Sequence, residues 1–205
     1  MPAEVMSIDS GNTVKNDDKA EASIITSPES ALQAGEVICY PTEAIFGLGC
    51  DPDNEEAVAK LLEIKSRPIA KGLILIADNY GQCLAYVDDN KIPMDKRAEI
   101  FSAWPGAITW LLPAKPETPH WLTGGHDTIA VRVTDHPIVK QICQRFGKPI
   151  VSTSANITGE TPVASLLHAR NQFGNQIGYY VDGELGTNRS PSVIKHAITG
   201  AVIRG

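Results

Sequence analysis

Continuous apolar runs alternate along the chain with segments in which apolar residues recur every three or four positions. Runs such as residues 72–77 (GLILIA) predict strands that are covered on both faces. Segments such as 55–66, where Ala57, Leu61 and Ile64 share one stripe, predict amphipathic helices. The expected helices cover 27–35, 55–66, 94–104, 136–147 and 163–174. The expected strands cover 36–41, 72–77, 107–114, 128–133, 149–155, 177–181, 191–195 and 201–204.

This alternation predicts an α/β fold, with one twisted mixed sheet flanked by helices. No repeat or linker divides residues 23–205, so we expect a single domain there. Ser27 and Pro28 are expected at the start of the first helix, and Asp53 or Asn54 at the start of the second. The stretch between the first strand and that helix is rich in turn residues and is expected to be a loop.

Composition narrows the class of protein. The chain has 205 residues, of which 42% are hydrophobic and 6% aromatic, as in soluble globular proteins. No apolar run reaches the roughly 18–20 residues that span a bilayer, so we expect no integral membrane protein. Residues 1–30 hold six acids and two bases, so they carry most of the net charge of −6. We therefore expect residues 1–22 to be a mobile acidic extension, and the acidic balance argues against nucleic-acid binding through bulk charge.

The cysteines and histidines show no metal-binding pattern. The four cysteines form no CxxC or CxH pair, and the five histidines show no HxxxH or HExxH spacing. We expect no metal site in the protein itself. We also expect reduced cysteines, which are typical of a cytoplasmic protein.

Two groups of candidate functional residues lie where predicted elements end, which is where ligands bind in α/β sheets. Tyr40, Thr42 and Glu43 follow the first strand, where they form either an ordinary turn or part of a site. The segment 65–72 (KSRPIAKG) holds Lys65, Arg67 and Lys71, three cations at the end of a helix. They either complement the helix dipole or bind an anion such as a polyphosphate, although no P-loop motif is present.

Two further groups are centred on later strands. Residues 152–159 (STSANITG) put three hydroxyls and an amide after an apolar strand, either as a self-capping turn or as a nucleotide or oxyanion site. No GxSxG motif accompanies them, so a serine hydrolase is disfavoured. Arg132 stands inside an apolar strand, either in an ion pair with Asp135 or Glu43 or as a binder of a carboxylate.

Five segments, taken together and in this order, resemble one family. They are CYPTEAIFGLGCDP, KSRPIAKGLILI, WPGAITWLLPA, DTIAVRVTDHP and PIVSTSANITG, at residues 39–52, 65–76, 104–114, 127–137 and 149–159. They resemble the YrdC/TsaC threonylcarbamoyl-AMP synthases over residues 27–205. The KxR and SxN pairs make the match specific. Because no second domain follows Gly205, the resemblance is to the short, single-domain bacterial form.

The resemblance implies a reaction and a setting. L-threonine, bicarbonate or CO2, and ATP with its Mg²⁺ give threonylcarbamoyl-AMP and pyrophosphate. A separate transferase complex then uses this intermediate to modify adenosine next to the anticodon of tRNA. The implied fold carries a deep, positively charged cavity. The implied enzyme is a cytoplasmic nucleotidyltransferase with no membrane association, and its contact with tRNA is weak or indirect.

The resemblance also assigns site residues. Lys65 and Arg67 are the implied catalytic cations facing the phosphates, and Ile76 stands where longer relatives carry a threonine-contacting histidine. The implied ATP-binding residues are Lys65, Arg67, Lys71, Thr128, Ser154, Asn156 and Arg204. The implied threonine-binding residues are Tyr40, Thr42, Arg132, Ser152 and Ser192.

Two other functions compete with this hypothesis. An RNA-binding module would use the basic cavity to hold phosphate backbone without turnover, although the low aromatic content disfavours it. An enzyme acting on sugar phosphates, as in riboflavin precursor synthesis, would need an acidic metal-binding loop that the KxR and SxN pairs do not supply.

Overall fold

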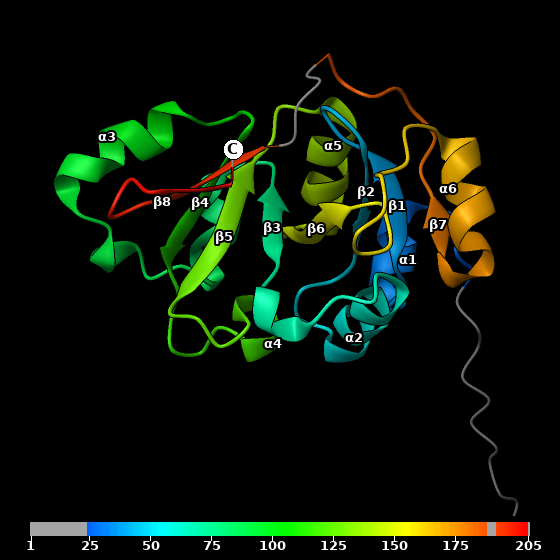
Figure 1. Ribbon diagram of the computed structural model, residues 1–205, viewed down its shortest axis with the longest axis horizontal. Coiled ribbons are helices and arrows are strands. Elements are labelled where there is room, and N and C mark those ends of the chain that lie inside the picture. Colours follow the sequence, from blue (N-terminus) through cyan, green and yellow to red (C-terminus); the bar gives the residue numbers. More distant parts are fainter. Residues whose placement is uncertain (1–23, 188–191, 205) are drawn as a thin grey trace, which may run out of the picture.

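Nine strands form one mixed sheet in the computed structural model, which describes residues 24–187 and 192–204. Their order across the sheet is β7-β1-β2-β6-β3-β5-β4-β8-β9, with parallel and antiparallel neighbours. The strands are β1 (Ile38–Pro41), β2 (Phe46–Gly49), β3 (Ile74–Ala77), β4 (Ile108–Pro113), β5 (Thr128–Val133), β6 (Ile150–Ser154), β7 (Tyr179–Tyr180), β8 (Val193–His196) and β9 (Val202–Arg204). Figure 1 shows β8 and β9 at one end of the sheet, and β7 at the other.

Six α-helices of the described chain flank this sheet. They are α1 (Pro28–Gln33), α2 (Glu55–Ile64), α3 (Met94–Ser102), α4 (His120–Thr123), α5 (Pro137–Phe146) and α6 (Leu166–Phe173). Ser27 caps α1, and the Asn54 side chain caps α2 by accepting from the amide of Ala57 at 3.0 Å. The predicted single-domain α/β fold with a mixed sheet is confirmed. The predicted extension, residues 1–22, lies outside the described residues.

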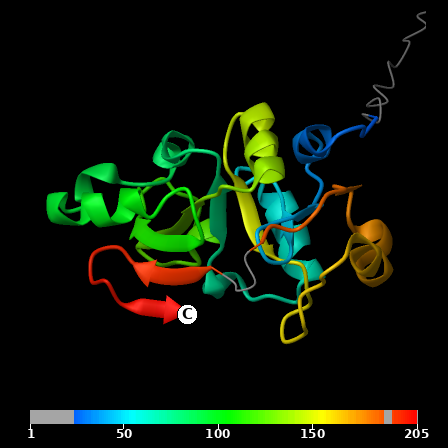
Figure 2. The ribbon, with the colours of Figure 1, turned by 90° about the horizontal axis from the view of Figure 1, so that it is seen from above.

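The alternation of side chains along the strands separates two parts of the core. In β1, Ile38 and Tyr40 pack with α1 and α5, whereas Cys39 between them packs with α2 and α6 on the other face. In β3, Ile76 and Leu75 divide between the two faces in the same way. Figure 2 shows α1 and α5 on the same side of the sheet. The central strands are therefore buried on both faces, as their continuous apolar sequences predict.

One strand was not predicted. The segment expected to be a turn-rich loop contains β2, which pairs antiparallel with both β1 and β6. Its sequence, FGLG, holds two glycines, which are poor strand formers. Gly49 is needed here because a Cβ atom would lie 2.5 Å from the Val151 carbonyl oxygen and 2.9 Å from the Tyr40 ring. Close packing between neighbouring strands thus overrides the local propensity.

The described residues also bear on two compositional expectations. All four cysteines are buried, and each is a free thiol. Within 24–187 and 192–204, no helix combines the length and the apolar character needed to cross a membrane.

Candidate functional site

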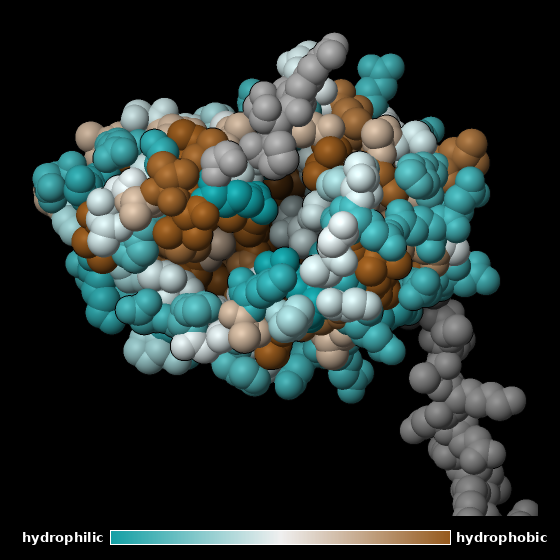
Figure 3. Space-filling view, viewed as in Figure 1, coloured by the Kyte–Doolittle hydropathy of each residue, from teal (hydrophilic) through white to brown (hydrophobic). Residues whose placement is uncertain are grey.

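A cavity of about 550 Å³ lies over the middle of the sheet, where alternate residues of three strands line it. These are Ile74 and Ile76 of β3, Thr128, Ala130 and Arg132 of β5, and Ser152 and Ser154 of β6, where Thr153 between them also contributes to the lining. Their neighbours Leu75, Val131 and Val151 point into the core on the opposite face. Figure 3 shows this molecule hollowed near its middle, with hydrophobic side chains along one side of the hollow. The volume is typical of a small-molecule site.

The charged side chains around the cavity are mostly positive. Among the described lining residues, Arg67, Lys71, Arg132 and Arg204 are cationic and Glu43 is the one carboxylate. Burial lowers the pKa of Arg67, and the nearby charge of Arg204 lowers it further. Burial and the charge of Arg132 act on the pKa of Arg204 in the same direction. Arg204 therefore repels both Arg67 and Arg132 around a space that an anion could fill.

Arg67 reaches the cavity from the loop that follows α2. Its Nη2 donates to the Gly72 carbonyl oxygen at 3.0 Å, while its buried Nε has no hydrogen-bond partner in the described chain. The loop is held from behind by α4, because the Leu73 amide donates to the Leu122 carbonyl at 2.8 Å. Gly124 permits this contact, because it adopts φ +68° and a Cβ there would lie 2.7 Å from the Gly72 nitrogen. Arg67 is thus positioned with hydrogen-bonding capacity to spare.

Lys65, two residues earlier, points away from the cavity. Its residue is 2% exposed, it is not among the lining residues, and its Nζ donates to the carbonyl oxygens of Ser154 and Asn156, the latter at 2.7 Å. Ser66 between the two cations has φ +47°, a left-handed conformation that is uncommon for a residue with a side chain. The expectation that both members of the KxR pair face one ligand does not match this arrangement. Lys65 instead holds the backbone of the loop that follows β6.

Burial gives Lys65 an unusual acidity. Removal of the ammonium from water and, to a smaller extent, the charge of Arg67 together lower the pKa of Lys65 to about 8. Its backbone carbonyl is used as well, because both the amide and the hydroxyl of Thr158 donate to it, at 2.9 and 2.8 Å. The end of α2 and the loop 154–158 are therefore joined by side-chain and main-chain contacts.

The SxN pair divides in the same way as the KxR pair. Ser154 lines the cavity, and its hydroxyl donates to Asn156 Oδ1 at 2.5 Å. The Asn156 amide nitrogen donates to the carbonyls of Ile157 and Glu160, both at 2.9 Å, and the residue is 9% exposed. Asn156 is not a lining residue, so it orients Ser154 and stabilises the turn rather than facing the cavity directly.

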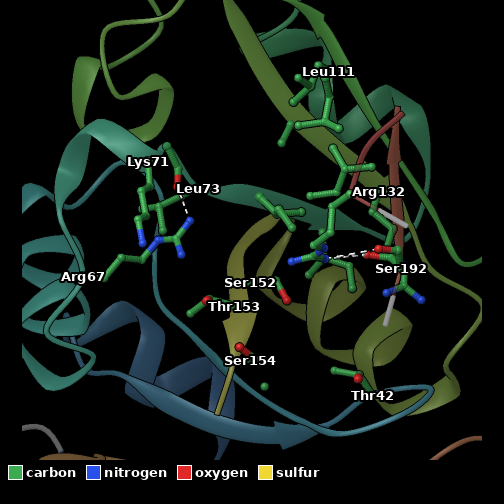
Figure 4. A pocket seen from close by; sticks show the side chains of 18 of the residues that line it. Thr42, Arg67, Lys71, Leu73, Leu111, Arg132, Ser152, Thr153, Ser154 and Ser192 are labelled. Carbon is green, nitrogen blue, oxygen red and sulfur yellow. Dashed lines mark hydrogen bonds between the residues drawn. The ribbon is translucent and has the colours of Figure 1, made fainter. Parts of the chain in front are cut away.

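Arg132 and Glu43 form an ion pair at the other side of the cavity. Arg132 Nη2 lies 2.7 Å from Glu43 Oε2, and Arg132 Nε donates to the Gly106 carbonyl at 3.0 Å. Of the two partners that the sequence left open, Glu43 rather than Asp135 makes this contact. Figure 4 shows Arg132 and Ser192 across the cavity from Arg67 and Lys71, with Ser152, Thr153 and Ser154 between them.

Tyr40 supports this side of the cavity from within the core. It is fully buried, is not among the lining residues, and its hydroxyl donates to Ser152 Oγ at 2.7 Å. Burial raises the pKa of Tyr40, so it stays a neutral donor. Thr42 lines the cavity directly, and its hydroxyl donates to the Ile45 carbonyl at 2.6 Å.

The remaining predicted residues all line the cavity. Arg204 Nη2 lies 3.2 Å from the Ser192 carbonyl oxygen, and Thr109 Oγ1 donates to Ser192 Oγ at 3.1 Å. Lys71 is exposed at the rim, and Thr128 begins β5. Ile76, noted for the absence of a histidine, is 1% exposed and contributes an apolar wall. Of the twelve predicted site residues, Tyr40, Lys65 and Asn156 are the three outside the described lining.

Some lining residues were not predicted as part of a site. They include His126, which carried no site prediction, while Glu43 and Thr153 belonged to the candidate groups after the first strand and at 152–159 without an assigned ligand. His126 lies two residues before the start of β5, in a glycine-rich turn that gave no chemical signal. In the described ranges, no three His, Cys, Asp or Glu side chains gather closely enough to hold a metal ion.

Comparison with known proteins identifies relatives of nearly full length. Residues 30–204 match the Sua5/YciO/YrdC family model, whose description is "Telomere recombination". A threonylcarbamoyl-AMP synthase of Pseudoalteromonas translucida is 64% identical over 186 residues, which cover 91% of this chain and 100% of the relative. A threonylcarbamoyl-AMP synthase of Yersinia enterocolitica is 51% identical over 190 residues, covering 93% of this chain and 98% of the relative.

Solved structures agree on the architecture. P. abyssi Sua5 complexed with L-threonine superposes with a TM-score of 0.78 at 29% identity and covers 85% of this chain. The match covers 51% of Sua5, so this chain spans about half the length of that protein. E. coli YciO has a TM-score of 0.73 at 22% identity, with 86% of this chain and 85% of YciO covered, a likeness of fold. By its family-model match and by these relatives, the chain belongs to the Sua5/YciO/YrdC family.

Proposed function

We propose that this protein is a threonylcarbamoyl-AMP synthase, which converts L-threonine, bicarbonate or CO2, and ATP into threonylcarbamoyl-AMP and pyrophosphate. The observation that carries the proposal is the cavity itself, which Arg67, Lys71, Arg132 and Arg204 line together with one described carboxylate. Such a site favours a polyanion together with a smaller carboxylate. The names of the relatives from P. translucida and Y. enterocolitica, and the L-threonine complex of Sua5, support this choice of ligands.

We assign the side of the cavity with Arg67 to the ATP phosphates. Arg67 Nε has no partner in the described chain, and Lys71 at the rim adds a second, exposed cation. The hydroxyl oxygen of Ser154, which Asn156 orients, is available to the nucleotide, and Thr128 also lines the cavity. Arg204 lies beside Ser192 on the other side, and we assign it to the phosphates from across the cavity. Preorganised cations stabilise the charge that develops on the leaving pyrophosphate.

We assign the side with Arg132 to L-threonine. The guanidinium would hold the substrate carboxylate, and Ser152, Thr42 and Ser192 offer hydroxyl groups around it. Tyr40 acts through Ser152, whose orientation its buried hydroxyl fixes. The substrates would then meet over β6, between the two charged ends of the cavity.

The chemistry needs positioning more than a protein nucleophile. The threonine ammonium first loses a proton, and the neutral amine adds to CO2 and releases a second proton to water as it becomes a carbamate. A carbamate oxygen then attacks the α-phosphorus of ATP, and pyrophosphate leaves. Holding the two reactants in line, with the negative charge neutralised, is the task of the cavity. Mg²⁺ would enter as part of the nucleotide substrate, with water as its remaining ligands. A separate transferase would carry the product to tRNA, in the cytoplasm and without membrane association.

Release of pyrophosphate tests the proposal. We expect the protein to release it at a steady rate only when ATP, L-threonine and bicarbonate are all present. Omission of any one of them, or replacement of L-threonine by D-threonine, should reduce the rate to background. Pyrophosphate release that does not depend on threonine would contradict the proposal. Salt-sensitive binding of tRNA without any turnover would also contradict it, because that is the behaviour of an RNA-binding module.

A further inference from the structure

Glu43 is the one carboxylate among the described residues that line the cavity, and its backbone is held firmly. It follows β1, and its neighbour Thr42 accepts a hydrogen bond from the amide of Gly186 at 3.0 Å. Gly186 packs so closely that a Cβ on it would lie 2.8 Å from the Glu43 Cα atom. The Glu43 side chain is 15% exposed, so its charge faces the cavity rather than bulk water.

The two carboxylate oxygens of Glu43 have different surroundings. Oε1 accepts a hydrogen bond from the Thr134 hydroxyl at 2.6 Å. Oε2 lies 2.7 Å from Arg132 Nη2 but receives no well-aligned hydrogen bond from any described residue, although it is buried. A buried carboxylate oxygen normally has a donor, so Oε2 has capacity left for a ligand.

Glu43 and Arg132 together present a negative and a positive group side by side. Their side chains are 15% and 11% exposed, and the Arg132 Nε bond to Gly106 fixes the guanidinium. An α-amino acid carries its ammonium and its carboxylate on adjacent atoms, in the complementary arrangement. A simple carboxylate would meet the repulsion of Glu43 without any compensating contact, so the pair favours a zwitterion over an anion.

We propose that Glu43 Oε2 binds the α-ammonium group of the amino-acid substrate while Arg132 binds its carboxylate. This inference rests on the proposed function, because it takes threonine as the occupant of this side of the cavity. It makes Glu43 a determinant of specificity for amino acids over hydroxy acids. The competing explanation is that Glu43 only orients Arg132 and never contacts the substrate.

A pair of ligands separates these explanations. (R)-3-hydroxybutyrate is threonine without its amino group, so it retains the contact with Arg132 and loses the contact with Glu43. Dissociation constants of both ligands would be measured by NMR titration of the full chain, for the wild type and for Glu43→Gln. Arg145→Ala, at an exposed position on α5, serves as the control variant.

We expect the wild type to prefer L-threonine over (R)-3-hydroxybutyrate by about 10- to 100-fold, the scale of one charged hydrogen bond. Glu43→Gln should reduce that preference to within about 3-fold, mainly by weakening threonine. Equal weakening of both ligands, or no weakening, would overturn the proposal and leave Glu43 as a partner of Arg132. If Glu43→Gln fails to fold, Glu43→Asp retracts the charge by one methylene and should lower the same preference; an unchanged preference would overturn the proposal.

Pyrophosphate release tests the proposed function separately from the role of Glu43. Pyrophosphate release by the wild type that depends on threonine supports the function whatever Glu43→Gln does to the preference. If the wild type turns over normally and Glu43→Gln leaves the preference for L-threonine over (R)-3-hydroxybutyrate unchanged, only the role of Glu43 is refuted. Absence of threonine binding by the wild type refutes both.

Discussion

Arg132 and Arg67 lie at opposite sides of one cavity but are held in different ways. Arg132 stands on the central strand β5, paired with Glu43 at 2.7 Å and anchored through Nε on Gly106. Arg67 stands on a loop and has, in the described chain, one hydrogen bond to a carbonyl, with Nε unpartnered. The charge of Arg132 is compensated before any ligand arrives, whereas that of Arg67 is not.

This difference predicts separate roles for the two sides of the cavity, one in selecting the substrate and the other in stabilising the transition state. A compensated pair on a rigid strand discriminates between ligands by shape and by the sign of their charges, at little cost to the free protein. The charged form of Arg67 is disfavoured by burial and by the charge of Arg204, and a bound polyanion would relieve this. Under the proposed function, we therefore expect the Arg67 side to provide the larger share of transition-state stabilisation and the Arg132 side to recognise the amino acid.

Removal of Arg67 should have the largest effect. We expect Arg67→Ala to lower turnover by about 100-fold or more, because one preorganised charge aimed at the phosphates is lost. Steady-state pyrophosphate release, compared with the exposed Arg145→Ala on α5, measures the loss. Turnover near that of the wild type would show that the uncompensated side is not where the phosphates bind.

Removal of Arg132 should change substrate binding selectively. We expect Arg132→Ala to raise the KM for threonine by about 10- to 100-fold, the value of a charged contact, while the KM for ATP changes by about 3-fold or less. The variant also strips the counter-ion from buried Glu43, so its thermal stability should fall. Arg132→Ala with Glu43→Gln should recover part of that stability without recovering affinity. An unchanged KM for threonine would contradict the assignment of the Arg132 side to the amino acid.

Much of the architecture was predictable because it follows local rules. Continuous apolar runs gave the strands of the sheet, and Ser27 with Pro28 gave the start of α1, since these signals are read from neighbouring residues. The strand β2 was missed because Gly47 and Gly49 serve contacts with distant residues, such as the Val151 carbonyl. No short segment of the sequence contains both partners of such a contact, so the need for glycine cannot be predicted locally.

The candidate site shows the same limit. Motifs placed nine of the twelve predicted residues in the cavity lining, but spacing cannot show on which side of a loop a side chain lies. Lys65 and Arg67 are separated by the left-handed conformation of Ser66, and Lys65 is turned toward carbonyls that lie about ninety residues away in sequence. Similarly, the position of Asn156 behind Ser154 depends on the path of the loop.

Replacement of Lys65 should have an intermediate effect on the binding of ATP. We expect Lys65→Met to raise the KM for ATP by about 10-fold, since the loop carrying Ser154 loses its charged anchor. Lys60→Met removes a partly exposed ion pair with Glu36 and is the matched control. If Lys65 acts through the loop, Ser154→Ala should add little to the effect of Lys65→Met. Additive losses would show instead that Lys65 binds the nucleotide independently.

The smallest effect concerns pH. The pKa of Lys65 is about 8, below its usual value of 10.5, so the folded protein loses this proton between pH 7 and 9. The neutral amine donates two hydrogen bonds instead of three, and we expect the KM for ATP to rise by about 3-fold over that interval. The titration of Lys65 should not lower the stability of the protein over this interval. Between pH 8 and 10.5 the unfolded chain still holds the proton that the folded chain has released, so the contribution of Lys65 to the free energy of unfolding increases as pH rises. Lys65→Arg, which stays charged, should abolish the change in KM; a wild-type rise that persists in Lys65→Arg would assign it to another group.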